Sequence, residues 1–113
     1  MDARLPAHLE VSAWLRRANA IGGFGMVIRK GEREAGTILL LTLQSGANAC
    51  AFERMPNPDG VRVWTVSKRQ NIENKQEFAE WLARREAQDR DLWVVELDTA
   101  LGERLIAELG TEG

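Results

Sequence analysis

Apolar residues recur at intervals of three and four positions near the start of the chain. They run from residue 11 to residue 18, while Arg16 and Arg17 fall outside this stripe. Because an α-helix has about 3.6 residues per turn, such a stripe occupies one face of a helix. A Gly-Gly pair follows at 22–23, and glycine ends a helix without steric penalty. The pattern therefore predicts a first helix that begins near Pro6 and ends before these glycines.

Five short segments are rich in residues that favour β-strands, and turn residues separate the first four. The expected strands are residues 25–30, 37–43, 49–54, 61–67 and 92–97. Residues 37–43 are apolar on both faces, which is typical of a central strand. The short connections among the first four strands predict an antiparallel meander, and a charged turn at 30–34 joins the first two. The strongest turn signal is the segment at 55–60, with two prolines and an Asp-Gly pair.

Two further helices are expected after the fourth strand. Asn74 followed by Glu77 resembles a capping box, and apolar residues then recur with helical spacing, so the second helix should span residues 75–88. As a crossover connection, this helix allows the fifth strand to lie parallel to a neighbour. Asp98 or Thr99 can cap the last helix. Its apolar residues are Leu101, Leu105, Ile106 and Leu109.

The order of elements is therefore α-β-β-β-β-α-β-α. It predicts the α+β class, with three helices on a mixed, mainly antiparallel sheet of about five strands. The chain has 113 residues, and domains typically hold about 100–150, so we expect a single domain over residues 1–113. Residues 111–113 should fray, as chain ends commonly do.

Composition restricts the class of function. The formal net charge is −2, which argues against obligate binding to nucleic acid or to an anionic membrane. The first residues lack the apolar run of a secretory signal. The longest strongly apolar run, residues 38–41, is far shorter than the roughly 20 residues of a membrane span. Cys50 is the only cysteine, so no internal disulfide can form. We expect a cytoplasmic protein with no membrane partner.

Candidate catalytic chemistry is sparse. His8 and Cys50 are the only imidazole and thiol, and neither has visible partners for a triad or metal site. Asp59, Glu73 and Lys75 match the PD…ExK pattern of restriction-endonuclease-like nucleases, which need two carboxylates on a divalent metal. In that fold the Glu and Lys share one face of a strand, whereas here they stand at a helix start. A turn and a helix cap are therefore the favoured interpretation, and a metal-dependent nuclease or small hydrolase is the alternative. We predict no catalytic residue, metal or cofactor.

Binding through surface arginines and a tryptophan is the remaining possibility. Three of the four tryptophans fall on apolar faces, whereas Trp64 alternates with Arg62 on a face that the pattern does not place. Core packing is favoured for Trp64 too, but an exposed Trp beside an Arg is typical of interfaces. The candidate binding residues are Arg16, Arg17, Arg29, Lys30, Arg33, Arg62 and Trp64.

The leading hypothesis is a small, non-enzymatic protein-binding or adaptor module. Its partner is an unidentified protein or a second copy of the chain, because a small sheet needs its edge strands covered. Nucleic-acid or anion binding is a further alternative, and we rank it lower because the net charge is negative. It would use the basic residues Arg16, Arg17, Arg29, Lys30 and Arg33.

Three stretches together resemble a known family. They are residues 11–17 (VSAWLRR), 31–36 (GEREAG) and 91–96 (DLWVVE). In these stretches and their order, the chain is similar to DUF1491, a family of short bacterial proteins of alphaproteobacterial type whose function is not established. The resemblance spans most of the chain and implies a stand-alone cytoplasmic protein of about this length. It brings no activity, cofactor or catalytic residue, so it transfers no functional residue.

Overall fold

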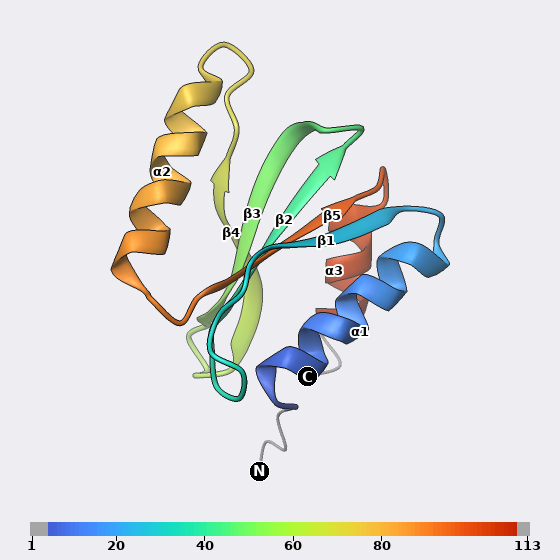
Figure 1. The fold of residues 1–113 in the computed structure, drawn as a ribbon, viewed down its shortest axis with the longest axis vertical. Coiled ribbons are helices and arrows are strands. Elements are labelled where there is room, and N and C mark those ends of the chain that lie inside the picture. Colours follow the sequence, from blue (N-terminus) through green and yellow to red (C-terminus); the bar gives the residue numbers. More distant parts are fainter. Residues whose placement is uncertain (1–4, 111–113) are drawn as a thin grey trace.

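The computed structural model describes residues 5–110, and its elements follow the predicted order (Figure 1). The helices are α1 (Ala7–Ala20), α2 (Lys75–Gln88) and α3 (Gly102–Gly110). The strands are β1 (Phe24–Arg29), β2 (Ile38–Gln44), β3 (Ala47–Pro56), β4 (Arg62–Arg69) and β5 (Trp93–Asp98). This confirms the predicted α+β class, with three helices and a five-stranded mixed sheet. The predicted fraying at residues 111–113 lies outside the described residues.

The sheet has the strand order β1-β5-β2-β3-β4. β5 is parallel to β2, as the crossover through α2 allows, and the other neighbours are antiparallel. The predicted four-stranded meander is wrong at its first step, because β5 lies between β1 and β2. β5 is buried on both faces from Trp93 to Val95. Burial on both faces favours a position inside the sheet, which leaves β1 at the edge.

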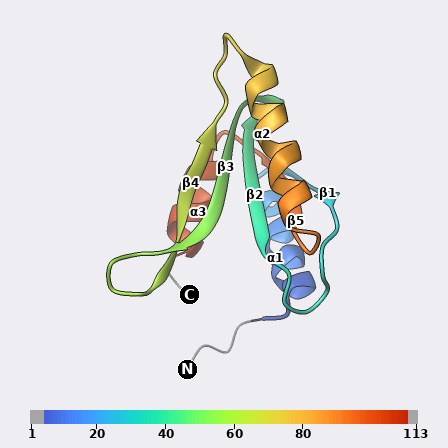
Figure 2. The same cartoon turned by 90° about the vertical axis from the view of Figure 1, so that its left-hand side faces the viewer.

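The helices form layers on both sides of the sheet (Figure 2). α1 and α3 pack on one face, against side chains such as Leu40, Trp93 and Val95. α2 packs on the other face, where Phe78 meets Leu39 and other residues of β2, β3 and the start of β5. The prediction that the second strand is covered on both sides is confirmed, since β2 contributes buried residues to both layers.

The helix caps match the sequence pattern in part. The Asn74 side chain accepts a hydrogen bond from the Glu77 backbone N–H at 3.2 Å, so the predicted cap of α2 is confirmed. The Glu77 carboxylate does not complete the capping box but pairs with Lys68 at 3.4 Å. Ahead of α3, the Thr99 hydroxyl accepts from the Leu101 N–H at 3.2 Å. The Asp98 carboxylate instead accepts from the backbone N–H groups of residues 45 and 46. Of the two predicted caps, only Thr99 therefore bonds the backbone next to α3, and it does so in the turn just before the helix.

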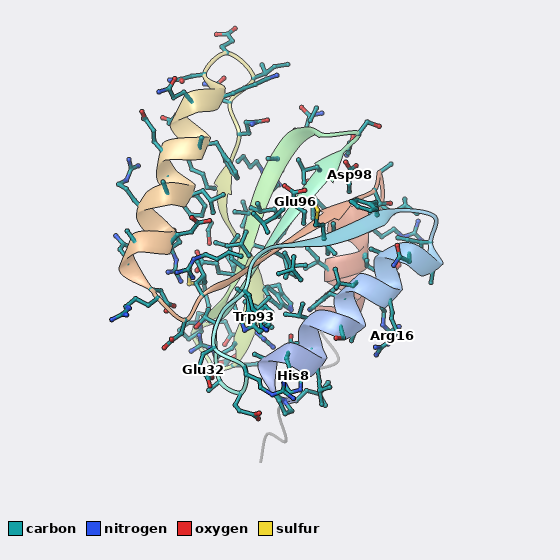
Figure 3. All side chains as sticks on the ribbon, viewed as in Figure 1. His8, Arg16, Glu32, Trp93, Glu96 and Asp98 are labelled. Carbon is teal, nitrogen blue, oxygen red and sulfur yellow. The ribbon has the colours of Figure 1, made fainter. Side chains whose placement is uncertain are left out.

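Residues 30–37 form a connection that crosses the start of β5, and not the predicted hairpin turn. The Trp93 indole N–H donates to the Glu32 carbonyl at 2.7 Å, which fixes the connection to the start of β5 (Figure 3). Its carbonyls at residues 33 and 34 accept from the first N–H groups of α1, at 2.9 and 2.8 Å. The free donors of the helix start are satisfied in this way. The stretches 31–36 and 91–96 therefore meet at the start of β5, beside the first residues of α1.

Gly31 and Gly36 make this crossing possible. A Cβ atom on either residue would clash with the Asp91 carbonyl oxygen, which lies directly against both backbones. The connection therefore passes over the start of β5 at a distance that only glycine permits. The glycines of the GEREAG stretch thus have a packing role that the sequence alone does not reveal.

Candidate functional site

The residues of the nuclease pattern do not come together. Asp59 lies in the turn between β3 and β4, while Glu73 and Lys75 lie just after β4, at its other end. β4 has eight residues, so about 26 Å of strand separates the two groups at roughly 3.3 Å per residue. One divalent ion cannot bridge that distance. Across residues 5–110, no group of three or more His, Cys, Asp or Glu side chains is placed to hold a metal.

The surroundings of His8 and Cys50 fit roles in the fold. The His8 Nδ1 lies 3.1 Å from the Arg33 carbonyl oxygen, at the start of α1. Cys50 is buried in β3, and this burial is the main cause that raises the pKa of its thiol. A raised pKa keeps the thiol protonated at neutral pH, which makes Cys50 a poor nucleophile.

The basic candidates are spread over the molecule. Arg29 is half-buried, and its guanidinium donates to the Leu92 carbonyl at 2.6 Å and to the Asp89 carbonyl at 3.3 Å. Arg33 pairs loosely with its neighbour Glu34, and Lys30 is exposed at the end of β1. Arg16 and Arg17 are exposed toward the other end of α1, where Arg16 points away from the sheet (Figure 3). The five residues therefore do not form one basic patch.

Trp64 is half-buried and packs against the core on the sheet face that α1 and α3 cover. Its ring makes an edge-to-face contact with Trp14, with centroids 5.8 Å apart. The Arg54 guanidinium lies 4.7 Å from the Trp64 ring centroid, so the cation on this ring comes from Arg54. Arg62 instead donates to the Arg54 carbonyl at 3.2 Å. Arg54 was not among the predicted binding residues, because counting outward from a turn at 55–60 pairs it with Val61. In the structure the strands continue to Pro56 and Arg62, and this register sets Arg54 opposite Trp64.

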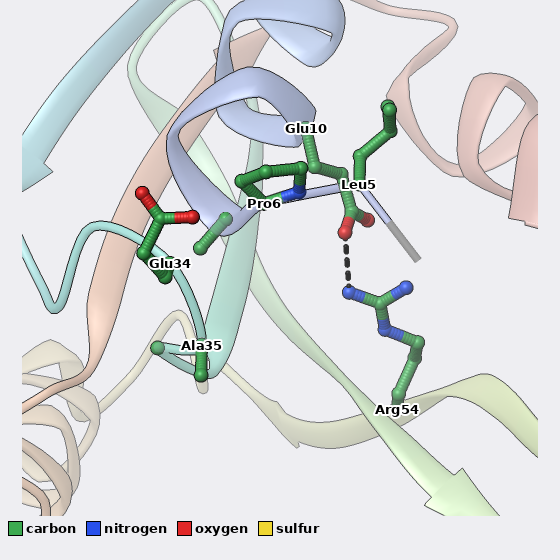
Figure 4. A pocket seen from close by; sticks show the side chains of 8 residues that line it. Leu5, Pro6, Glu10, Glu34, Ala35 and Arg54 are labelled. Atoms are coloured by element: carbon green, nitrogen blue, oxygen red, sulfur yellow. Dashed lines mark hydrogen bonds and ion pairs between the residues drawn. The ribbon is translucent and has the colours of Figure 1, made fainter. Parts of the chain in front are cut away.

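A hollow of about 280 Å³ lies beside Arg54, between the start of α1 and the connection before β2 (Figure 4). Arg54 forms an ion pair with Glu10 at 2.8 Å along one wall. The other walls come from Leu5, Pro6, Ala7, Glu34, Ala35 and Gly36. Because Arg54 pairs with Glu10 and Glu34 pairs with Arg33, the hollow offers little uncompensated charge to attract a ligand.

Glu53 is the one buried charged side chain among residues with described burial. Arg85 on α2 donates to one carboxylate oxygen through Nε at 2.9 Å and Nη2 at 2.7 Å. The Ser67 hydroxyl donates to the other oxygen at 2.9 Å. Both oxygens are therefore satisfied, and this cluster holds α2 to the sheet.

β1 carries the largest concentration of exposed apolar side chains. Four of its six residues belong to the exposed large hydrophobic residues of the chain. Phe24, Met26 and Ile28, which we call the β1 stripe, are 58%, 42% and 42% exposed. Phe24 and Met26 share the sheet face that α2 covers elsewhere, because Met26 lies opposite Glu96, two residues after Val94. Ile28 lies at a bulge between Val27 and Arg29, which interrupts the alternation there. α2 lies over β2, β3 and the start of β5, so it leaves this end of the face open (Figure 1).

The outer edge of β1 is also open. β1 pairs only with β5, so among residues 5–110 no strand covers its other side. Natural proteins protect such edges with charges, prolines or bulges. β1 has no proline, and its one charged residue, Arg29, is half-buried at the end of the strand. Its bulge lies at that same end, between Val27 and Arg29, so the edge from Phe24 to Val27 is regular. An apolar stripe beside unpaired backbone groups is the arrangement that accepts an added strand.

Charge is distributed unequally along this edge. Glu96 and Asp98 of β5 lie opposite Met26 and Phe24, so the carboxylates flank one end of the β1 stripe (Figure 3). Lys30 lies just beyond the other end. Burial, and then the charge of Asp98, raise the pKa of the Glu96 carboxyl. The β1 edge therefore has an acidic end and a basic end.

Comparisons with known proteins agree with the fold and leave the activity open. A family model described as "Protein of unknown function (DUF1491)" matches residues 5–107. The crystal structure of a DUF1491 family protein from Caulobacter crescentus CB15 is 34% identical, covering 85% of this chain and 89% of that one, with a TM-score of 0.69. The solution structure of protein Atu0922 from A. tumefaciens is 31% identical, covering 85% and 86%, also with a TM-score of 0.69. No curated protein matches the chain. Within residues 5–110, no helix has the length and apolarity to cross a membrane.

Proposed function

The chain belongs to the DUF1491 family of proteins of unknown function, and we propose that it is a non-enzymatic protein-binding module whose β1 edge accepts an extended strand. The observation that supports this function is the β1 stripe, which is apolar, exposed and set beside an unpaired strand edge. An added strand gains backbone hydrogen bonds from such an edge. It also gains affinity where its alternate side chains cover the apolar stripe.

The geometry defines the chemistry of the ligand strand. Because successive side chains of a strand point to opposite faces, the ligand needs apolar residues at every second position. A basic residue at the end next to Phe24 would face the carboxylates of Asp98 and Glu96. Charge complementarity of this kind sets orientation and register more than affinity.

The single cysteine is consistent with a reducing compartment, and the proposal places the module in the cytoplasm. Cys50 is free and buried, so the fold does not depend on a disulfide. Proteins of the cytosol rarely rely on disulfides for stability.

Selection from a library of displayed random peptides would test the proposed function. We expect the enriched peptides to alternate apolar and polar residues, and Met26→Lys to weaken their binding at least about tenfold, as loss of a central apolar contact does. Ile72→Lys is the matched control, because Ile72 is 75% exposed and lies in the connection between β4 and α2, outside β1. Failure to enrich any peptide, or peptides that bind wild type and Met26→Lys equally, would contradict the proposal.

A further inference from the structure

We infer that the strand accepted at the β1 edge carries a lysine or arginine opposite Met26, and that Glu96 on β5 is the residue that selects it. This inference rests on the proposed function, because it names the chemical class of strand that the same edge accepts. It uses only the regular stretch of the edge, from Phe24 to Val27, where Met26 pairs with Glu96. The partner is therefore a basic, apolar strand, and apolar alternation alone does not satisfy the site.

Glu96 is half-buried among apolar neighbours and has no cation beside it. Its cross-strand neighbours are Met26 on β1 and Leu41 on β2, and Leu41 is buried. Among residues 5–110, no hydrogen bond or ion pair involves the Glu96 carboxylate. Its burial, together with the charge of Asp98, raises the pKa of this carboxyl. A carboxylate that loses hydration without gaining a partner is unfavourable, and a cation supplied by a ligand would compensate it.

Asp98 and the basic side chains between the sheet and α2 already have partners. The Asp98 carboxylate accepts from the backbone N–H groups of residues 45 and 46, at 2.7 and 2.9 Å. Lys68 of β4 and Arg85 of α2 form ion pairs with other carboxylates, at 3.4 and 2.7 Å. Of the two carboxylates that flank the β1 stripe, Glu96 is therefore the one that a ligand cation can pair with (Figure 3).

A long basic side chain can reach Glu96 from the ligand strand. That strand would lie two strand spacings from β5, about 9.5 Å, with β1 between them. A ligand residue opposite Met26 points to the same face, so its side chain and that of Glu96 approach each other over Met26. Lysine and arginine lay their aliphatic stems along apolar surface and keep the charge beyond it. Met26 is 42% exposed and offers that surface, whereas a shorter polar side chain would not span the gap.

Parallel selections from one library of displayed random peptides test this inference. We expect the wild-type chain to enrich peptides with lysine or arginine at one position among alternating apolar residues. Glu96→Gln should enrich alternating apolar peptides without that basic residue. Glu80→Gln is the matched control, because it removes an exposed carboxylate from α2, and it should select the same peptides as the wild type. Wild-type peptides that lack an enriched basic position would overturn this inference alone, whereas failure to enrich any peptide would contradict the proposed function as well.

Fluorescence polarisation with one peptide enriched on the wild type measures the contact itself. Replacing the basic residue of that peptide with glutamine should weaken its binding to the wild type at least about fivefold, because the pair forms at a half-buried carboxylate. The same replacement should change binding to Glu96→Gln little, and added salt should reduce the preference of the wild type. Circular dichroism should show Glu96→Gln folded, which separates recognition from folding. Equal losses for the wild type and Glu96→Gln would place the cation elsewhere and overturn the inference.

Discussion

Arg85→Leu should be among the most destabilising substitutions in α2, because it leaves the Glu53 carboxylate without its cation inside the fold. The Glu53 side chain is 7% exposed, and Arg85 supplies two of its three hydrogen bonds, at 2.7 and 2.9 Å. Removing one partner of a buried pair costs about 3–5 kcal/mol, because the remaining charge is then buried without compensation. The Ser67 hydroxyl stays as a donor, which places the expected cost near the lower end of that range.

Urea unfolding followed by tryptophan fluorescence measures this cost. The double variant Glu53→Gln/Arg85→Leu should recover part of the loss, because a neutral amide still accepts from Ser67 and carries no charge to bury. Arg104→Leu is the matched control, because its pair with Glu108 is exposed, and exposed pairs contribute about 0–1 kcal/mol. The argument is refuted if Arg85→Leu costs no more than Arg104→Leu, or if the double variant is less stable than Arg85→Leu alone.

Three further expectations concern the connection before β2, the face of α2 and the acidic end of β1. Gly31→Ala should destabilise the fold by about 1–3 kcal/mol in urea unfolding, because the new methyl group meets the Asp91 carbonyl; an unchanged midpoint would contradict the close crossing. Trp81→Ala should cost less than Phe78→Ala, for which about 3–5 kcal/mol is expected, because Trp81 is only half-buried whereas Phe78 is buried. Glu96→Gln should stabilise the fold at neutral pH. The raised pKa of Glu96 means that its charged form is disfavoured in the folded state, so the gain should disappear as the pH falls through that pKa. A gain that persists at low pH would assign the effect to another cause.

Local signals in the sequence predicted local structure well. The Asn74 cap and the helical spacing after it give the bounds of α2, residues 75–88, without error. The two-sided apolar run of β2 correctly indicates a strand covered on both faces. Both signals lie within a few residues of the structure that they determine. The hydrogen bonds of a cap, and the burial of one segment, depend little on distant parts of the chain.

Strand pairing was predicted less well, because it depends on residues far apart in the sequence. The glycines and charges at 30–36 are equally typical of a hairpin turn and of a crossing connection. What decides between them is β5, which begins at Trp93 and inserts between β1 and β2. The edge position of β1, and with it the candidate site, follows from that insertion. No pattern within residues 24–29 distinguishes an edge strand from an inner one, whereas the arginines and Trp64 stand out in the sequence by residue type alone.

The difference in charge between the two sheet edges supports a function for β1. If the apolar side chains of β1 served only the stability of one chain, a charge at Met26 or Ile28 would cost little, because both side chains are more than a third exposed. Such a charge would also protect the edge, as Arg62, Lys68 and Arg69 protect β4. An edge that keeps three large apolar residues in its place incurs a risk of aggregation without a gain in the isolated fold. A strand that covers β1 removes this risk, so the exposed stripe is better explained by binding than by folding.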